Sequence, residues 1–504
     1  MFLKNLRYCL CVISFFYFSC FAFANPWYCN SVDKVVSNEV WSFKVTISGS
    51  NLTLTSRLAG SGDLDFTSLF DDTGCRVVTV GSSLFSKNTA ITGFIAPDVV
   101  NVGASAFAQA TALTNVVISP NVHTLQNNCF YKCSAIKTFS PTRMESLKSC
   151  GYHIFNGTSK MTLDFEFPVL TSISEGMFSA SAAVSVRAPK ATKVVTGAFS
   201  SSSVTLVELS PDLTAINNNG FLSCTKLKTF IPTTLPNFTS FGTAVFSGCS
   251  LLEGDWNFPV LTSLPKEIFS GCSKITSFIA PKLTSIGNHV FKSCTSLKSV
   301  HVSDAITTIG TQAFLSCKSL SDFSPTDLPN LTSTGNAAFS GCSNLSCQWF
   351  FPKLTSIAAE FFTSTNIKAV NAPKLTTVGN NAFRYCKSVE HVVIKGGGSI
   401  GSYAFEGFAA GAVIDYLGDT PPTSIGTGAF YPYHNDNYTR VYLRRYKAKD
   451  GWKAFVTPAS SLNSSMLARS DYPGKRTLGL YQATQSKAWV IDGDHNQNTI
   501  ITVK

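Results

Sequence analysis

The chain has 504 residues, a formal net charge of +11, 44% hydrophobic residues and only 14% charged residues. This composition excludes a disordered chain, and the length exceeds what one ordinary globular core supports. The choice lies between several domains and a repeat array whose core grows with length, and the 40 Phe residues suit a continuously buried interior.

Residues 1–24 have the features of a secretory signal peptide. Lys4 and Arg7 precede an apolar stretch over residues 8–23, and residues 22–24 (Ala-Phe-Ala) fit a small-x-small cleavage site. One alternative is an uncleaved anchor, for which the apolar stretch is short. The other is a lipid anchor at Cys20, but the residues before Cys20 match the sequence that precedes a lipid-modified cysteine poorly. We therefore expect a secreted or cell-surface protein, with no transmembrane segment in the mature chain.

Residues 25–80 contain no clean repeat, so we expect them to cap the N-terminal end of an array. Two cysteines in this segment, Cys29 and Cys75, can form a disulfide in a secreted protein. The sequence leaves this pairing open.

Residues 81–455 repeat, with one Phe every 21 to 25 residues, a period typical of leucine-rich repeats. In a representative unit Leu297, Val300 and Val302 give the L-x-x-L-x-L core, whose alternation predicts a short strand. One unit cannot bury its own apolar residues, whereas stacked units build a continuous core. The repeat Phe residues are 85, 107, 130, 155, 178, 199, 221, 246, 269, 291, 314, 339, 362, 383, 405 and 430.

The predicted fold is a leucine-rich-repeat solenoid of about 16 units with a C-terminal cap. A parallel β-sheet should line the concave face, short helical or irregular segments the convex face, and the repeat Phe residues an internal spine. The Gly in Ile286-Gly287, Ile309-Gly310 and Val378-Gly379 is interpreted as a turn residue that adopts a conformation other residues avoid.

The units are grouped in larger blocks. The Phe spacings are 23, 25, 23 and 21 from Phe107, 22, 25, 23 and 22 from Phe199, and 23, 25, 23 and 21 from Phe291, so each block spans 92 residues. The long unit of each block contains a related tripeptide sequence: Ser140-Pro141-Thr142, Ile231-Pro232-Thr233 and Ser324-Pro325-Thr326. Duplication of a four-unit block explains this pattern better than chance.

The motif I-G-x-x-A-F-x-x-C-x-x-L, clearest at residues 309–320, resembles the BspA-like leucine-rich repeats of bacterial and protist surface proteins. The resemblance covers most of the chain, from about Phe85 to Phe455. Residues 441–452 are also similar to the segment that often closes such arrays, although Leu443-Arg444 stands where Val-Pro is usual. The resemblance implies surface exposure and binding of proteins on host or neighbouring cells; it does not name a ligand.

Eight cysteines lie three residues after a repeat Phe: Cys133, Cys224, Cys249, Cys272, Cys294, Cys317, Cys342 and Cys386. One Cys per unit lacks the paired spacing of a metal site, so small core side chains are the favoured interpretation. The seven His residues show no metal-binding spacing. We therefore expect no metal, no cofactor and no catalytic site.

Strand alternation predicts which residues are buried and which face solvent. Phe165, Trp256 and Trp349 recur at equivalent places and suggest an aromatic platform for sugars, but they share a face with core Phe residues, which favours burial. The positions between core residues should line the exposed concave sheet and bind a partner: Ile95, Val117, Arg187, Glu208, Ile231, Ile279, His301 and Val393. Several of these residues are apolar, which favours a protein ligand.

The C-terminal part carries a basic cluster formed by Arg440, Arg444, Arg445, Lys447, Lys449 and Lys453. It is either a solvated part of the cap or a site for an acidic glycan; nucleic acid is not expected, because no recognition module accompanies it. Residues 456–504 are expected to form a linker and a small β-rich appendage. The sequence thus predicts a non-enzymatic adhesion protein whose partner is a host or neighbouring-cell surface or matrix protein, with glycan binding and self-assembly in an envelope layer as alternatives.

Overall fold

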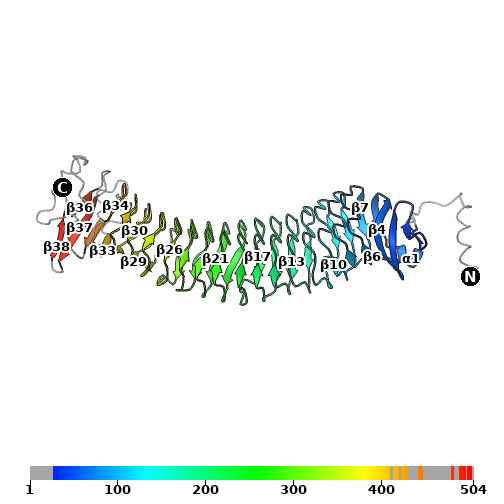
Figure 1. Cartoon of the computed structure of the whole chain (residues 1–504), viewed down its shortest axis with the longest axis horizontal. Helices are drawn as coiled ribbons and strands as arrows, with labels where there is room; N and C mark the ends of the chain where they lie inside the picture. The colour runs from blue at the N-terminus through cyan, green and yellow to red at the C-terminus, as the bar shows by residue number, and fades with distance from the viewer. Residues whose placement is uncertain are drawn as a thin grey trace, which may run out of the picture.

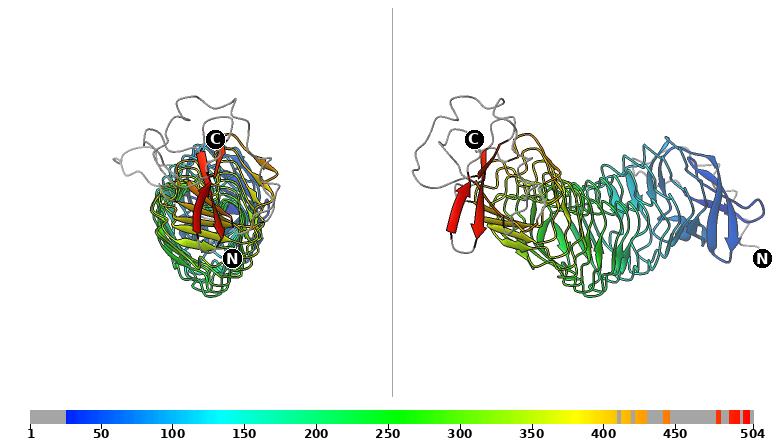
Figure 2. Two further views of the ribbon diagram at one scale, coloured as in Figure 1. Left: turned by 90° about the vertical axis from the view of Figure 1, so that its left-hand side faces the viewer. Right: turned by 60° about the vertical axis from the view of Figure 1, so that its left-hand side comes forward.

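The computed structural model describes residues 26–408, 412–418 and 422–429, together with the backbone of strands at 441–445, 478–481, 487–494 and 497–501. The chain forms an elongated, gently bowed solenoid (Figure 1). Viewed from the C-terminal end, the coils lie behind one another around a common axis (Figure 2). The expected signal peptide and the linker that begins at residue 456 lie outside the described residues.

Each coil contributes one strand to a first ladder, which we call the long ladder, and its pairs are parallel. Strands form here because apolar and polar residues alternate around the repeat's Leu and Val positions. The strands are β5 (Gly62–Asp65), β7 (Ile91–Ile95), β9 (Asn115–Val117), β11 (Thr138–Ser140), β12 (Asp164–Glu166), β13 (Ser185–Ala188), β15 (Leu206–Leu209), β17 (Thr229–Ile231), β19 (Glu253–Asn257), β21 (Lys274–Ile279), β23 (Ser299–His301), β25 (Asp322–Ser324), β27 (Gln348–Phe350), β29 (Ala369–Ala372), β31 (His391–Ile394), β33 (Val413–Tyr416) and β35 (Val441–Arg445).

A second ladder, the short ladder, is built mostly from two-residue strands on the next side of each coil. Its strands are β6 (Arg76–Val80), β8 (Asn101–Val102), β10 (Thr124–Leu125), β14 (Lys193–Val194), β16 (Ala215–Ile216), β18 (Ser240–Phe241), β20 (Ser263–Leu264), β22 (Ser285–Ile286), β24 (Thr308–Ile309), β26 (Ser333–Thr334), β28 (Ser356–Ile357), β30 (Thr377–Val378), β32 (Ser399–Ile400) and β34 (Ser424–Ile425). The two ladders enclose the core.

Both ends of the array carry antiparallel strands. Before the repeats, β1 (Tyr28–Asn30), β2 (Val35–Ser37), β3 (Ser42–Ser48) and β4 (Asn51–Ala59) form an antiparallel meander, and β4 pairs parallel with β6 of the short ladder. After the repeats, β37 (Lys487–Asp494) pairs parallel with β35 and antiparallel with β36 (Leu478–Tyr481) and β38 (Gln497–Ile501).

The segments around the repeat Phe residues are turns. The one α-helix among the described residues is α1 (Leu69–Thr73), which precedes β6. In the unit of Phe314, the residues two before and two after it, Gln312 and Ser316, have φ of 52° and 62°. This left-handed backbone points the Phe314 N–H at the next coil, where it donates to the Ala338 carbonyl at 2.7 Å. An α-helix would keep such bonds within its own segment.

The predicted internal Phe spine is confirmed. Every neighbouring pair from Phe85 to Phe405 stacks, with ring centroids 4.8 to 6.0 Å apart. All these Phe side chains are fully buried. Phe430 lies outside the described residues. Stacking one ring per coil fixes the register of the coils and supplies the hydrophobic core that no single unit has.

The interpretation of the Ile-Gly glycines as left-handed turn residues is wrong. Gly287, Gly310 and Gly379 are absent from the positive-φ residues. A Cβ added at Gly310 would lie 2.5 Å from the carbonyl carbon of Gly287, and one at Gly379 would lie 2.5 Å from the Ala359 nitrogen. The glycine is therefore required for the close approach of successive coils, which a side chain would block.

The interpretation of the repeated cysteines as core residues is confirmed, because all eight are buried. Each thiol also donates to the carbonyl of the Phe in the preceding coil, as Cys317 does to Phe291 at 3.0 Å and Cys386 to Phe362 at 2.9 Å. In other coils the same position holds a small hydroxyl residue, such as Ser202 or Thr365. Burial raises the pKa of the Cys386 thiol to about 12. The Cys386 thiol therefore stays protonated and can act as a donor between coils.

The 92-residue block is visible as a recurring break in the long ladder. The ladder stops between β11 and β12, between β17 and β19, and between β25 and β27. Each break follows a strand that ends in a cis X-Pro bond, at Pro141, Pro232 and Pro325. Proline has no N–H to donate to the ladder, so the strand cannot continue through it. One isolated bridge spans each break: Arg143 to Glu166, Thr234 to Asn257, and Asp327 to Phe350.

Candidate functional site

The outward face of the long ladder is a regular surface that extends along the described coils. In each strand the central residue points into the core, as Val186, Phe278 and Trp349 do, while its two neighbours point outward. Parallel pairing in register aligns these outward residues into rows across the coils. We call this surface the outward face.

The structure places the eight sequence-predicted binding residues on this face. Ile231, Arg187 and His301 are exposed, and the other five are half-buried. They fall in one row: Ile95 pairs with Val117. Arg187, Glu208 and Ile231 are consecutive, as are Ile279 and His301, and Val393 lies beyond the third break. The row also contains Asp65, Ser140, Glu166, Asn257, Ser324, Phe350, Asn371, Asp415 and Arg444.

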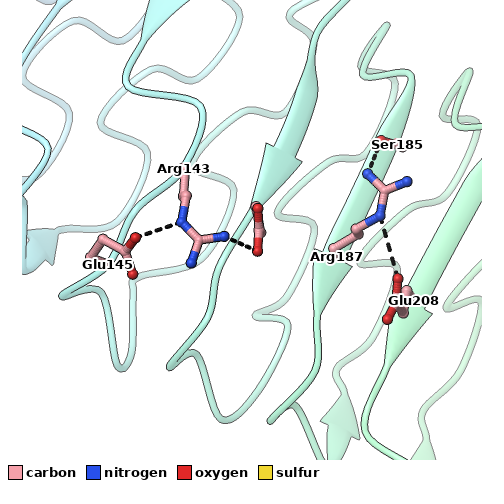
Figure 3. Close-up of polar contacts among 6 residues, drawn as sticks. Arg143, Glu145, Ser185, Arg187 and Glu208 are labelled. Carbon is pink, nitrogen blue, oxygen red and sulfur yellow. Dashed lines mark hydrogen bonds and ion pairs between the residues drawn. The ribbon is translucent and has the colours of Figure 1, made fainter.

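Charged residues dominate the row from the first break to β15. Arg143 Nε lies 2.5 Å from Glu145, and its guanidinium also pairs with Glu166 across the ladder break. Two strands on, Arg187 Nε lies 3.4 Å from Glu208 (Figure 3). These side chains are about half exposed, so the pairs add little stability and mainly fix the arrangement of charges. In this part of the face the charged side chains pair with one another within the chain.

The middle of the face combines apolar and polar groups. Ile231 is 42% exposed on β17, just before the second break. Beyond this break Ile279 lies beside His301, and His301 Nε2 lies 2.8 Å from Asp322 on the adjacent strand. Asp255 on β19 accepts hydrogen bonds from Thr276 and Ser277, which lower the pKa of its carboxyl group. Cross-strand polar pairs therefore hold the exposed side chains in place.

The third break contains a hollow of about 430 Å³. Its lining residues come from the break and from β27, β29 and β31: Thr326, Asp327, Gln348, Trp349, Phe350, Ala369, Val370, Asn371, His391 and Val393. Phe350 is 36% exposed, an unusual degree for this residue type. His391 Nε2 lies 2.6 Å from the buried carboxylate of Asp415. This hollow lies on the predicted face, and Val393 is the predicted binding residue that lines it.

The prediction that the recurring aromatic residues are buried is confirmed. Phe165, Trp256 and Trp349 are exposed by only 1%, 0% and 2%. They pack against the spine, with Trp256 5.2 Å from Phe246 and Trp349 5.2 Å from Phe339 between ring centroids. These rings therefore cannot serve as an exposed sugar platform.

The basic cluster lies mostly outside the described residues. Arg440, Lys447, Lys449 and Lys453 are not described, while Arg444 and Arg445 belong to β35 at the end of the long ladder. Pairing with β33 aligns Arg444 with Asp415. Within the part of the chain that the structure describes, no group of His, Cys, Asp or Glu could hold a metal ion, and no helix is long and apolar enough to cross a membrane.

Several residues of this face were missed by sequence reasoning. Phe350, Asn371 and His391 occupy outward positions of β27, β29 and β31, and only for β27 had the sequence identified the central residue, Trp349, as buried. Alternation around Trp349 would have pointed to Phe350. Asp327 directly follows the recurring Pro-Thr of the long units, but the strand alternation that places the other residues does not extend to it.

Comparison with known proteins defines the class and then the family. The fold is a parallel β-solenoid of the leucine-rich-repeat class, and the model of the BspA-type leucine-rich repeat region matches in six copies over residues 74–182, 162–276, 262–390 and 376–443. The matches cover well over half of the chain, which therefore belongs to the BspA-type leucine-rich-repeat family. Proteins of this type are typically cell-surface proteins, are typically non-enzymatic, and as leucine-rich-repeat proteins generally bind proteins.

Solved structures of bacterial leucine-rich-repeat proteins are similar to this chain. A leucine-rich repeat protein from Bacteroides ovatus ATCC 8483 is 18% identical, with a TM-score of 0.46, over 81% of this chain and 94% of that one. A leucine-rich cell surface protein from Faecalibacterium prausnitzii A2-165 is 18% identical, with a TM-score of 0.39, over 83% of this chain and 97% of that one. No curated protein sequence is significantly similar to this chain.

Proposed function

We propose that this chain is a non-catalytic, secreted or cell-surface adhesion protein whose outward face binds a protein on a host or neighbouring cell or in the surrounding matrix. The observation that carries the proposal is the row of aligned outward residues, in which the exposed apolar side chains of Ile231 and Phe350 lie among fixed polar pairs. Apolar side chains framed by polar ones are typical of protein-binding surfaces.

The fold supports this proposal because the outward face is independent of the core. Core side chains such as Val207 and Phe230 point inward, whereas their neighbours Glu208 and Ile231 point outward and do not contribute to the core. A rigid, extended surface with freely variable side chains suits the recognition of a large partner, as in other solenoids. In the same proposal, residues 1–24 are a cleaved signal peptide, residues 25–80 cap the array, and residues 456–504 form a C-terminal appendage.

The test is a binding assay with residues 25–504 on intact cells and immobilised matrix proteins, with a glycan array in parallel. Ile231→Asp should weaken saturable protein binding by about ten-fold or more, since a charge replaces an exposed apolar contact. Leu251→Asp is the matched control, because Leu251 is 45% exposed on a turn outside the long ladder and its change should leave binding within about two-fold.

A second variant separates the outward face from the basic cluster. Changing Arg440, Arg444, Arg445, Lys447, Lys449 and Lys453 together to Gln should leave protein binding intact. Glycan binding that disappears with these six residues would move the function to the C-terminal cap. Self-assembly of the chain with no binding to any cell or protein would refute adhesion and favour a structural role in an envelope layer.

A further inference from the structure

The three breaks in the long ladder are equivalent places with different contents. In the first break the guanidinium group of Arg143 lies between two carboxylates, those of Glu145 and Glu166. In the third break the corresponding bridge joins Asp327 to Phe350. Asp327 makes no ion pair with any residue that the structure describes. The first break thus carries its own cation, and the third does not.

The five long-ladder strands β25, β27, β29, β31 and β33 contain neither Lys nor Arg. Lys353, which follows β27, donates from its Nζ to Asn330 Oδ1 at 2.7 Å, and no ion pair joins it to Asp327. Lys368, just before β29, lies 3.9 Å from Glu390. The two histidines on this part of the face, His301 and His391, each face an aspartate of the next strand. The exposed carboxylate of Asp327 is therefore left for a group from outside the chain.

The other groups that line the hollow suit a flat cation. Gln348 and Asn371 are exposed and present amide oxygens, which accept hydrogen bonds. Phe350 presents an exposed aromatic side chain beside them. A guanidinium group stacks on such a ring, and its five N–H groups form a planar fork that matches a carboxylate. The volume of about 430 Å³ is sufficient for one long side chain.

We propose that the hollow at the third break binds the guanidinium group of an arginine side chain supplied by the partner protein. The arginine pairs with Asp327, stacks on Phe350 and hydrogen-bonds to the amide oxygens of Gln348 and Asn371. It thereby supplies a guanidinium group at the third break, where Asp327 stands at the position that Arg143 has at the first break. That the arginine comes from a protein rests on the function proposed above.

The test uses small probes on residues 25–504, so it does not depend on a known partner. Binding of N-acetyl-arginine amide is measured by ligand-observed NMR at low salt, with N-acetyl-citrulline amide as the uncharged probe of the same shape. We expect a dissociation constant on the order of 1 mM for the arginine probe. The citrulline probe should bind at least about ten-fold more weakly, because the charge-assisted hydrogen bond is lost.

Variants place the binding in the hollow. Asp327→Asn and Phe350→Ala should each weaken binding of the arginine probe by about five-fold or more. Asp212→Asn is the matched control: Asp212 is an exposed aspartate far along the array, and its removal changes the net charge equally. Equal binding of both probes, or an unchanged affinity in Asp327→Asn, would overturn the proposal.

Two further outcomes are decisive. Binding of the neutral sugar N-acetylglucosamine that Phe350→Ala abolishes, without arginine binding, would overturn the proposal and make the hollow a glycan subsite. Arginine-probe binding that persists while Ile231→Asp leaves cell binding unchanged would support the hollow and refute the proposed role of the whole face. Probe binding thus tests the hollow, and cell binding separately tests the proposed function of the outward face.

Discussion

Replacing Phe291 by Ala tests the internal spine. Its ring is fully buried, stacks on Phe269 at 5.7 Å and on Phe314 at 5.2 Å, and meets Phe278 edge-on at 5.0 Å between centroids. Truncation of a buried Phe costs about 3–5 kcal/mol. Three ring contacts, each contributing about 0.5–1.5 kcal/mol beyond burial, place the expected loss in the upper part of that range.

The assay is equilibrium urea unfolding of residues 25–504, followed by far-ultraviolet circular dichroism. Hydrogen exchange in the coils on either side of Phe291 is measured in parallel, because repeat arrays can unfold in parts. Phe350→Ala is the matched control, since Phe350 is 36% exposed and its removal should cost less than about 1 kcal/mol. A loss below about 1 kcal/mol for Phe291→Ala, with unchanged local exchange, would refute the spine.

Three further outcomes follow from the packing. Oxidation with glutathione disulfide should join Cys29 to Cys75, whose sulfurs lie 3.7 Å apart across 46 residues, and raise stability by about 4 kcal/mol; peptide mapping that finds both thiols free after oxidation contradicts this. Gly310→Ala should cost about 1–3 kcal/mol in urea unfolding, because the new Cβ meets the preceding coil, and a neutral effect would show that the coils can separate. The lowered pKa of Asp255 means that its contribution to stability is present above the unfolded pKa and is lost as pH falls through the folded pKa; Thr276→Val should raise that pKa in a carboxyl NMR titration, and an unchanged value would exclude this hydrogen bond as the cause.

The fold could be predicted from the sequence because its core is periodic. Each coil must bury the same kinds of side chain at the same places, so the spacing of Phe291 and Phe314 and the alternation around Val300 specify strand, turn and spine together. The burial of Cys317 follows from the same periodicity. Its hydrogen bond to the Phe291 carbonyl does not, because it depends on how neighbouring coils are offset.

The remaining features depend on distances between coils, which no local pattern encodes. Gly310 is a turn residue by sequence context, and only the 2.5 Å approach to Gly287 shows that it is needed for close packing. The outward row follows from alternation, and so Ile231 could be placed on the surface in advance. The hollow could not be predicted, since the strand alternation does not extend to Asp327, which acquires its position only where the long ladder stops.

The recurring ladder break has a consequence for how such a protein diversifies. Because the Phe spine passes each break without interruption, a whole block can be copied without rebuilding the core. The three copies of the bridge have since taken different chemistry, as a charged pair at Arg143, a small polar pair at Thr234 and an open hollow beside Asp327. Duplication thus supplies this chain with spare binding positions, each of which can change its ligand while the others keep the molecule folded.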